Sequence, residues 1–346
     1  MPLTKRVTHM DVARRAGVSP AVVSYVVNNG PRATSPDARA RVLTAIEELG
    51  YHPNAFARGL ARQETHTIGF VMHDYVPSDM FAAPYTVAIL SGLTSALKAK
   101  EHYTLIYPSM IDENLASLSA LLHSGRVDGL VVRPVQESPA SDPLMDVIAA
   151  ARVPCVCIEH AAADRFGFPT LTYDDEGGAY AATQYLVARG HRRIGHLQGD
   201  VRYPAARARL DGYKRALVEA GLDRDEGLIQ GNDWSSSDVA QGVRHLLESA
   251  DPPTAIFAAN DVRAMGAIMT LHERGYRIPE DVAIIGFDDI PLARDMTPPL
   301  TTVRIPLVEL GRSAADIVLR LIEEPGAGDA AVSRTLPVEL VHRGTA

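Results

Sequence analysis

Short apolar runs alternate with longer amphipathic segments through most of this 346-residue chain, and the alternation restarts once, after residue 168. Near-continuous apolar strands that alternate with helices are typical of parallel sheets covered on both faces. Two such series predict two similar α/β lobes. The predicted strands are 67–71, 103–107, 129–133 and 154–158, then 170–172, 193–197, 227–229, 255–258 and 282–286. The predicted helices are 83–99, 114–124 and 141–151, then roughly 176–190, 205–221, 236–250 and 261–275.

The predicted lobes are expected to bind a ligand where their strands end. Ligands of open parallel sheets bind beyond the carboxyl ends of the strands, here in a cleft between the lobes.

A chain of this length is too long for one ordinary core, and an apolar content of 46% is that of a globular protein. The only cysteines, Cys155 and Cys157, stand two apart in an apolar run, which predicts reduced packing residues on one face of a buried strand.

The first 30 residues have the pattern of two short helices joined by a tight turn. Thr8 can cap the first helix, with Asp11 three residues later as its capping-box partner, and Gly17 can supply the turn. Ser19 and Pro20 then open the second helix. This arrangement is the helix-turn-helix, whose second helix lies in the DNA major groove. Because any small helical hairpin uses the same turn chemistry, this segment alone leaves a purely structural hairpin open.

A third predicted helix follows at Ser35, with Pro36 at its first turn and Gly50 at its end. Its expected buried stripe is Val42, Leu43, Ile46 and Leu49.

Charge separates this head from the rest of the chain. Residues 1–64 hold nine lysines and arginines against five acidic residues, a net charge of +4. The whole chain carries −8, so the remaining 282 residues carry −12. A basic head on an acidic body fits attraction of phosphates by the head alone, although a solvated charged face would have the same balance.

Several phrases along the chain resemble the lactose-repressor/galactose-repressor family. The phrases are 11–28, the junction 51–54, the short helix ending at 60–61, and then 188–195, 206–212, 258–261, 285–289 and 298–304. The resemblance implies an N-terminal all-α helix-turn-helix DNA-binding domain plus a hinge helix. It also implies a C-terminal α/β two-lobe domain with parallel sheets, like that of periplasmic sugar-binding proteins. The implied divisions are 1–52, a hinge helix and linker at 53–64, and an effector-binding and dimerisation domain at 65–346, with lobe 1 at about 65–166 plus 296–325 and lobe 2 at about 167–295 plus 326–346.

The resemblance implies contacts with DNA from the head and the hinge. Tyr25 stands where the family usually has arginine or histidine, and one hydroxyl cannot grip guanine bidentately, so the operator sequence is not predicted. Ala21 could touch a thymine methyl or could simply favour the helix. Leu60 is expected to enter the minor groove as a wedge when two hinge helices pair, with a core position as the alternative. The implied DNA-side residues are His9, Ser19, Pro20, Ala21, Ser24, Tyr25, Asn28, Arg39, Asn54 and Leu60.

The resemblance also implies effector contacts in the predicted cleft, whose carboxylates, amide, arginine and indole suit a polyhydroxylated ligand. Asn260 could instead merely cap the next helix, and Asp288 could cap a strand end. Arg207 and Arg209 point to different sides of one helix, so only one is expected to enter the cleft. The implied effector residues are Glu159, Arg209, Trp234, Asn260 and Asp288, with Phe81, Tyr85 and Arg133 as candidates on the first-lobe wall.

Three function classes compete: a ligand-gated transcription regulator, a periplasmic binding protein and an α/β enzyme. No phosphate-binding glycine motif, metal-ligand spacing or G-x-S-x-G elbow occurs, so we expect no cofactor, no metal and no catalytic residues.

With no signal peptide and no membrane-length apolar run, we expect a cytoplasmic, nucleoid-associated protein that does not bind membranes. The expected partners are double-stranded operator DNA, a small effector such as a sugar or sugar derivative, and a second copy of the chain. Because no leucine heptad follows 338–341, we expect a homodimer, not a tetramer.

Overall fold

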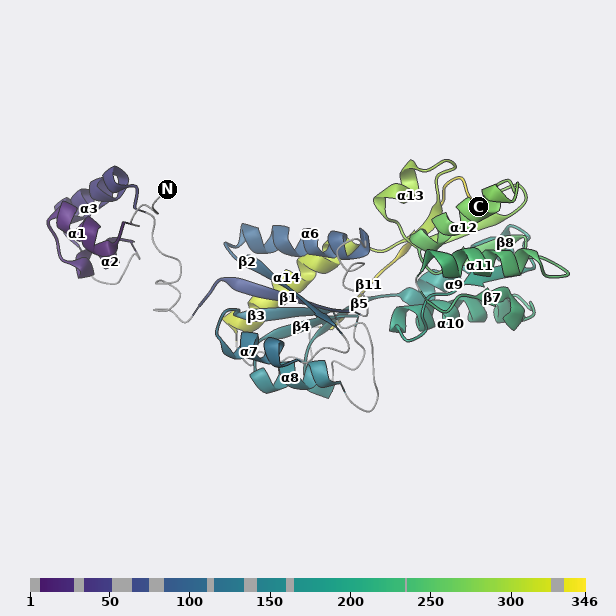
Figure 1. Cartoon of the computed structure of the whole chain (residues 1–346), viewed down its shortest axis with the longest axis horizontal. Coiled ribbons are helices and arrows are strands. Elements are labelled where there is room, and N and C mark those ends of the chain that lie inside the picture. Colours follow the sequence, from purple (N-terminus) through teal and green to yellow (C-terminus); the bar gives the residue numbers. More distant parts are fainter. Residues whose placement is uncertain are drawn as a thin grey trace. The chain divides into compact units, whose positions relative to one another are not determined.

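The computed structural model describes residues 7–27, 34–51, 64–74, 84–110, 115–133, 142–159, 165–233, 235–324 and 333–346. The chain divides into two compact units, Met1–His66 and Thr67–Ala346 (Figure 1). The first unit is helical, and the second contains two sheets.

The first unit contains α1 (His9–Ala16), α2 (Pro20–Val27) and α3 (Pro36–Leu49). The capping box predicted at the start of α1 is present, since the Thr8 hydroxyl accepts from the Asp11 amide and the Asp11 carboxylate accepts from the Thr8 amide. Gly17 and Gly50 end α1 and α3 in the left-handed region, with φ of 64° and 57°. Glycine adopts this region without the steric cost that a Cβ would bring.

The core of this unit is small and apolar, with Val12, Val23 and Val42 fully buried. One expectation is wrong: Leu43 is 49% exposed, and Ala45 is buried in its place. Residues three apart on a helix share a face, so the register that buries Val42 also buries Ala45 and turns Leu43 toward solvent.

The second unit begins with a sheet in which each pair of neighbouring strands is parallel. Its order is β11-β5-β4-β3-β1-β2. Helices α6 and α14 cover one face of this sheet, and α7 and α8 cover the other (Figure 1). The strands are β1 (Thr67–Asp74), β2 (Tyr103–Met110), β3 (Gly129–Arg133), β4 (Cys155–Ile158), β5 (Thr170–Tyr173) and β11 (Arg334–Leu336). The helices are α6 (Pro84–Ala99), α7 (Ala116–His123), α8 (Pro143–Ala151) and α14 (Leu307–Glu323).

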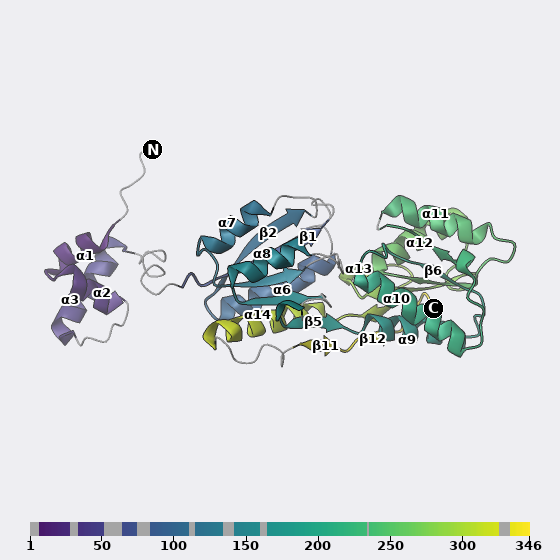
Figure 2. The same cartoon turned by 90° about the horizontal axis from the view of Figure 1, so that it is seen from below.

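The second sheet has the order β12-β10-β9-β8-β6-β7 and is parallel except for β12, which pairs antiparallel with β10. Helices α9 and α10 pack together, as do α11 and α12 (Figure 2). The strands are β6 (Ile194–Leu197), β7 (Ile229–Gln230), β8 (Ala255–Ala258), β9 (Ala283–Asp288), β10 (Thr301–Arg304) and β12 (Glu339–Val341). The helices are α9 (Asp175–Ala188), α10 (Pro204–Glu219), the 3-10 turn η2 (Glu226–Leu228), α11 (Ser236–Leu247), α12 (Asp261–Glu273) and α13 (Pro291–Asp295).

The chain passes between the two sheets at points that differ from the predicted lobe limits. The predicted limits place β5 in the second lobe, but it pairs with β4, with Cys157 opposite Thr170, so the first crossing follows Tyr173. They place β10 in the first lobe, but it pairs with β9. They place β11 in the second lobe, but it pairs with β5 in the first sheet. These three corrections have one cause: an apolar run predicts a strand, whereas its partner strand is set by contacts distant in sequence.

Close helix packing joins the start and end of the first lobe. A Cβ at Gly92 of α6 would lie 2.0 Å from the Val308 carbonyl oxygen, and one at Gly311 of α14 would lie 2.0 Å from that of Ile89. Only glycine permits these helix backbones to approach so closely. Among the described residues, no helix is long and apolar enough to cross a membrane.

The two cysteines have the environment that the sequence predicts. Cys155 and Cys157 are buried and form no disulfide, and both lie in the apolar cluster between β4 and helices α7 and α8. Burial raises the pKa of the Cys155 thiol well above its ordinary value. They are packing residues.

Candidate functional site

Helix α2, the second helix of the predicted helix-turn-helix, presents its first turn to solvent. Ser19, Pro20 and Ala21 are exposed, and the Ser19 hydroxyl accepts a hydrogen bond from the Val22 amide at 3.4 Å. Tyr25, one turn later, is half-buried. The exposed first turn has the accessibility that a base-reading helix N-terminus requires.

The remaining DNA-side candidates are spread over the unit. Ser24 is half-buried, and Arg39 is exposed on α3. His9 lies against Tyr51 with 5.4 Å between ring centroids. Asn28, Asn54 and Leu60 lie outside the described residues.

A first polar cluster forms around Glu159, directly after β4. The hydroxyls of Tyr85 and Tyr173 each donate a hydrogen bond to a different oxygen of the Glu159 carboxylate. The Arg133 Nε lies 3.3 Å from the same carboxylate, and its guanidinium lies 4.8 Å from the centroid of the Tyr85 ring. The structure therefore brings together three of the predicted residues, Tyr85, Arg133 and Glu159.

A second polar cluster forms around Arg209 of α10, whose side chain is 4% exposed. Its Nε donates to the Asp175 carboxylate at 2.7 Å, and its Nη1 donates to the Ala259 carbonyl oxygen at 2.5 Å and lies 3.4 Å from Asp288 Oδ1. The guanidinium stacks 3.9 Å from the centroid of the Phe287 ring. Arg207, two residues away, is exposed, and its Nη1 donates to the backbone carbonyl oxygens of Val201 and Arg202 in the loop before α10.

Tyr173 joins the two clusters. Its hydroxyl donates to Glu159 on one side and lies 3.4 Å from Arg209 Nη2 on the other. Tyr173 ends β5 in the first sheet, and Arg209 belongs to the helix pair of the second sheet. A continuous polar network thus connects the carboxyl ends of strands from both sheets, where ligands of parallel sheets bind.

Burial shifts the proton equilibria of this network. Burial, and next the Glu159 charge, raises the pKa of Tyr85 and of Tyr173 well above the ordinary value, so both remain donors. Burial raises the pKa of Asp175 to about 7 and that of Asp288 to about 8, in spite of the opposing Arg209 charge. Burial opposes the Arg209 charge, but Asp175 and Asp288 outweigh it and raise the pKa of the guanidinium. The site holds a permanent cation beside carboxyls that titrate near neutrality.

The backbone at two of the predicted carboxylates is unusual. Glu159 has φ of 58° and Asp288 has φ of 113°, a region that side-chain-bearing residues rarely adopt. The turn after Asp288 is held by the buried Asp261, whose carboxylate accepts from the Ile290 amide at 2.8 Å and from the Thr302 hydroxyl. Such conformations persist where the surroundings over-determine them, and they concentrate at binding sites.

Asn260 caps helix α12, the alternative left open by the sequence. Its side-chain oxygen accepts from the Arg263 amide at 2.8 Å. Because only the oxygen is used in this bond, capping leaves the amide group as a donor for a ligand. Asn260 can therefore serve both roles.

Sequence reasoning missed Tyr173, Asp175 and Phe287. The polar residues that follow the predicted strand 170–172 were a usable signal for Asp175, but nothing local marked Tyr173 as a contact of Glu159. Phe81 and Trp234 lie outside the described residues.

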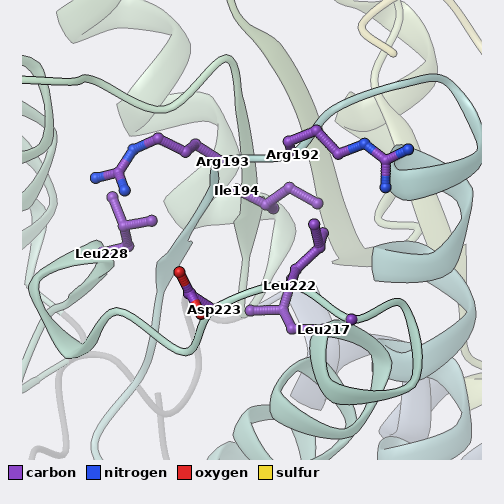
Figure 3. Close-up of a pocket in the computed structure, with 8 residues that line it drawn as sticks. Arg192, Arg193, Ile194, Leu217, Leu222, Asp223 and Leu228 are labelled. Atoms are coloured by element: carbon purple, nitrogen blue, oxygen red, sulfur yellow. The ribbon is translucent and has the colours of Figure 1, made fainter.

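A surface cavity of about 240 Å³ lies elsewhere in the second lobe (Figure 3). It is formed by Arg192, Arg193 and Ile194 at the start of β6, together with Leu217, Gly221, Leu222, Asp223 and Leu228. In Figure 3 the side chains of Arg192 and Arg193 point in opposite directions, with apolar side chains between them. Arg193 is already bonded to Asp225 and Asp251. The cavity lies at the amino end of β6 and contains none of the predicted site residues.

Comparison with known proteins places these features in a family. Residues 8–54 match the family of bacterial regulatory proteins named lacI, and residues 183–346 match the periplasmic binding protein-like domain. The ribose operon repressor of Escherichia coli (strain K12) is 34% identical and covers 98% of this chain and 99% of its own. The transcriptional repressor PurR of Serratia proteamaculans (strain 568) is 36% identical and covers 90% of this chain and 89% of its own.

Solved structures agree over nearly the full length. The lac repressor dimer bound to operator and an anti-inducer has a TM-score of 0.84 and 29% identity, covering 99% of both chains. The regulator CelR in complex with cellobiose has a TM-score of 0.75 and 31% identity, covering 99% of this chain and 100% of that one. These relatives are described as regulators of transcription and not as enzymes. The chain thus belongs to the lacI family of bacterial regulatory proteins.

Proposed function

We propose that this chain is a homodimeric transcriptional repressor whose affinity for a pseudo-palindromic operator is set by a small polar effector. Each chain carries one helix-turn-helix, and operators of such proteins mirror the two-fold symmetry of a dimer. We assign residues 1–52 to operator binding, 53–64 to a hinge helix that carries Leu60, and 65–346 to effector binding and dimerisation. We assign the protein to the cytoplasm, associated with the nucleoid.

The observation that carries the effector site is the buried network joining Glu159, Tyr173 and Arg209 across the two sheets. Its carboxylates accept hydrogen bonds from ligand hydroxyls, and the amide of Asn260 and Arg133 donate to ligand oxygens. A sugar or sugar derivative fits this set best. Similar proteins include a ribose operon repressor and a regulator whose structure was solved in complex with cellobiose.

Effector control requires that the ligand bind two arrangements of the lobes with different affinity. We propose that the effector changes the angle between the lobes, and that this change alters whether two hinge helices pair on DNA. Pairing would then decide whether Leu60 enters the minor groove.

The test has two steps. An operator is first selected from random duplex DNA with the purified chain. Its affinity is then measured by fluorescence anisotropy with and without D-ribose, cellobiose and a panel of other sugars and nucleosides, the same panel being screened by thermal shift. We expect one compound to raise the melting temperature and to change operator affinity. Failure to select any duplex, or operator affinity unchanged by every compound that binds, would contradict the proposal.

A further inference from the structure

Arg263 is a buried cationic side chain in the first turn of a helix, where the helix dipole disfavours positive charge. It is the third residue of α12 after the Asn260 cap, and it is 1% exposed. A cation in the first turn of a helix opposes the helix dipole, which favours acidic residues there. Burial of a guanidinium also costs free energy unless its donors find acceptors. The position therefore has a purpose other than the stability of α12.

The three donor nitrogens of Arg263 reach three different segments. Nε donates to the Leu197 carbonyl at the end of β6 (3.3 Å), Nη1 to the Asp233 carbonyl (2.5 Å), and Nη2 to the Asp238 carboxylate of α11 (2.8 Å). A planar guanidinium holds such acceptors in one fixed fork, which a lysine cannot do. The side chain thus joins Asp233, in the loop after β7, to the end of β6 and to α11.

The same loop is held by further bonds that converge on this arginine. The other Asp238 oxygen accepts from the Asn232 amide at 3.0 Å, and the Gln198 side chain donates to the Gly231 carbonyl at 2.8 Å. The Ser235 hydroxyl caps α11 through the Asp238 amide. Residues on both sides of position 234 are therefore anchored, while Trp234 itself lies outside the described residues.

Gly231 shows how closely the loop is fitted to the arginine. It has φ of 106°, and a Cβ there would lie 2.3 Å from Arg263 Nη2 and 3.0 Å from Asp238 Oδ2. Any larger residue would have to displace the ion pair. The loop and the Arg263–Asp238 pair occupy one interlocking arrangement.

We propose that Arg263 is the positioning residue of the loop after β7, whose residues 231–233 it fixes, and that this loop belongs to the effector site. Arg263 does not touch the effector; by fixing the loop at the carboxyl end of β6, it sets the effector affinity of the second lobe. This inference rests on the proposed function, because the loop joins the effector site only through the effector contact that the family resemblance implies for Trp234.

The test uses Trp234, the only tryptophan of the chain, as a probe. Time-resolved fluorescence anisotropy of the effector-free, full-length protein measures local motion of the indole. We expect Arg263→Met and Gly231→Ala to increase the fast local depolarisation of the indole, because both substitutions release the loop. Arg263→Lys should give a depolarisation between those of the wild type and Arg263→Met. Arg274→Met, on an exposed arginine that follows the same helix, is the matched control and should behave as wild type.

Two results would overturn the inference. One is wild-type depolarisation in a folded Arg263→Met protein. The other applies if that variant does not fold: Asp238→Asn, which keeps the shape of the side chain but removes the charge, would then show wild-type depolarisation.

Effector titration separates this inference from the proposed function. If D-ribose or cellobiose binds the wild type, we expect about tenfold weaker binding to Arg263→Met, as loss of a charged hydrogen-bond anchor predicts. Unchanged affinity would overturn the inference even if the indole moves. If no compound of the panel binds the wild type, the proposed function fails, while the anisotropy still decides whether Arg263 positions the loop.

Discussion

In the first unit the exposed side chains assigned to DNA, Ser19, Pro20 and Ala21 at the start of α2 and Arg39 on α3, lie outside the small core. In the second unit the side chains assigned to the effector include Glu159 and Arg209, which bond to Tyr85, Tyr173 and Asp175 in one network at the ends of the strands. Substitutions at the DNA surface should therefore change recognition without changing stability. Substitutions in the network around Glu159 and Arg209 should change both effector recognition and stability, because each one leaves a buried polar or charged group without its partner.

Arg209→Ala should have the largest effect. Removing one partner of a buried ion pair costs about 3–5 kcal/mol, and Asp175 and Asp288 both lose their cation. Urea denaturation should report this loss, and effector response should disappear. Arg207→Ala, an exposed neighbour on the same helix, should change stability by less than about 0.5 kcal/mol. Equal effects of the two substitutions would contradict the buried network.

The pH dependence of stability should reveal Asp288. Its folded pKa of about 8 exceeds the ordinary 3.8, with Arg209, Asp261, Glu159 and Arg133 as its charged neighbours. Between these two pH values the unfolded chain has released a proton that the folded chain retains. Stability therefore falls as pH rises through this window, by up to about 1.4 kcal/mol per pH unit for this carboxyl.

Asp288→Asn should make that dependence shallower, because an amide resembles the protonated carboxyl and cannot ionise, while Asp175, with a pKa raised by burial to about 7, still contributes. Urea denaturation of wild type and variant at pH 5, 6, 7 and 8 measures it. Parallel curves for the two proteins would show that Asp288 does not titrate in this range.

Leu60→Ala tests the other unit. Loss of a minor-groove wedge should weaken operator binding by about tenfold or more, about 1.4 kcal/mol, and should reduce the DNA bend. Effector affinity should stay as in wild type. Gel phasing measures the bend, and an unchanged bend would favour a core position for Leu60.

Tyr25→Phe should have the smallest effect and affect only recognition. A lost hydroxyl hydrogen bond to a base costs about 0.5–1.5 kcal/mol of operator affinity. Thermal unfolding should not change, because the side chain is half-buried at the surface of α2. Operator selection repeated with the variant would show an altered base preference at one position; an identical preference would remove Tyr25 from base reading.

The two units also differ in how far the sequence alone predicts them. The caps of α1 and α3 depend on residues within four positions of each other, so local rules predicted Thr8, Asp11 and Gly50 correctly. Strand pairing is not local, and β5, β10 and β11 were each assigned to the wrong lobe for that reason.

The effector network shows the same limit. Family matches led to Glu159, directly after a predicted strand, to Asp288, two residues after another, and to Arg209 on a predicted helix. They did not lead to Tyr173, because its role depends on meeting Glu159 and Arg209 from two different sheets. The role of a residue that contacts both lobes can be recognised only from the folded structure of both.

The central claim is that the network around Glu159 couples effector binding to operator binding. The most direct measurement is operator affinity by fluorescence anisotropy, in wild type and in Glu159→Gln. It is made with and without the compound that the panel of sugars and nucleosides identifies as a ligand. We predict that the compound changes wild-type operator affinity by about five- to 150-fold, the usual range of coupling between sites, and that the variant binds operator normally without this response. An equal response in both proteins would contradict the claim.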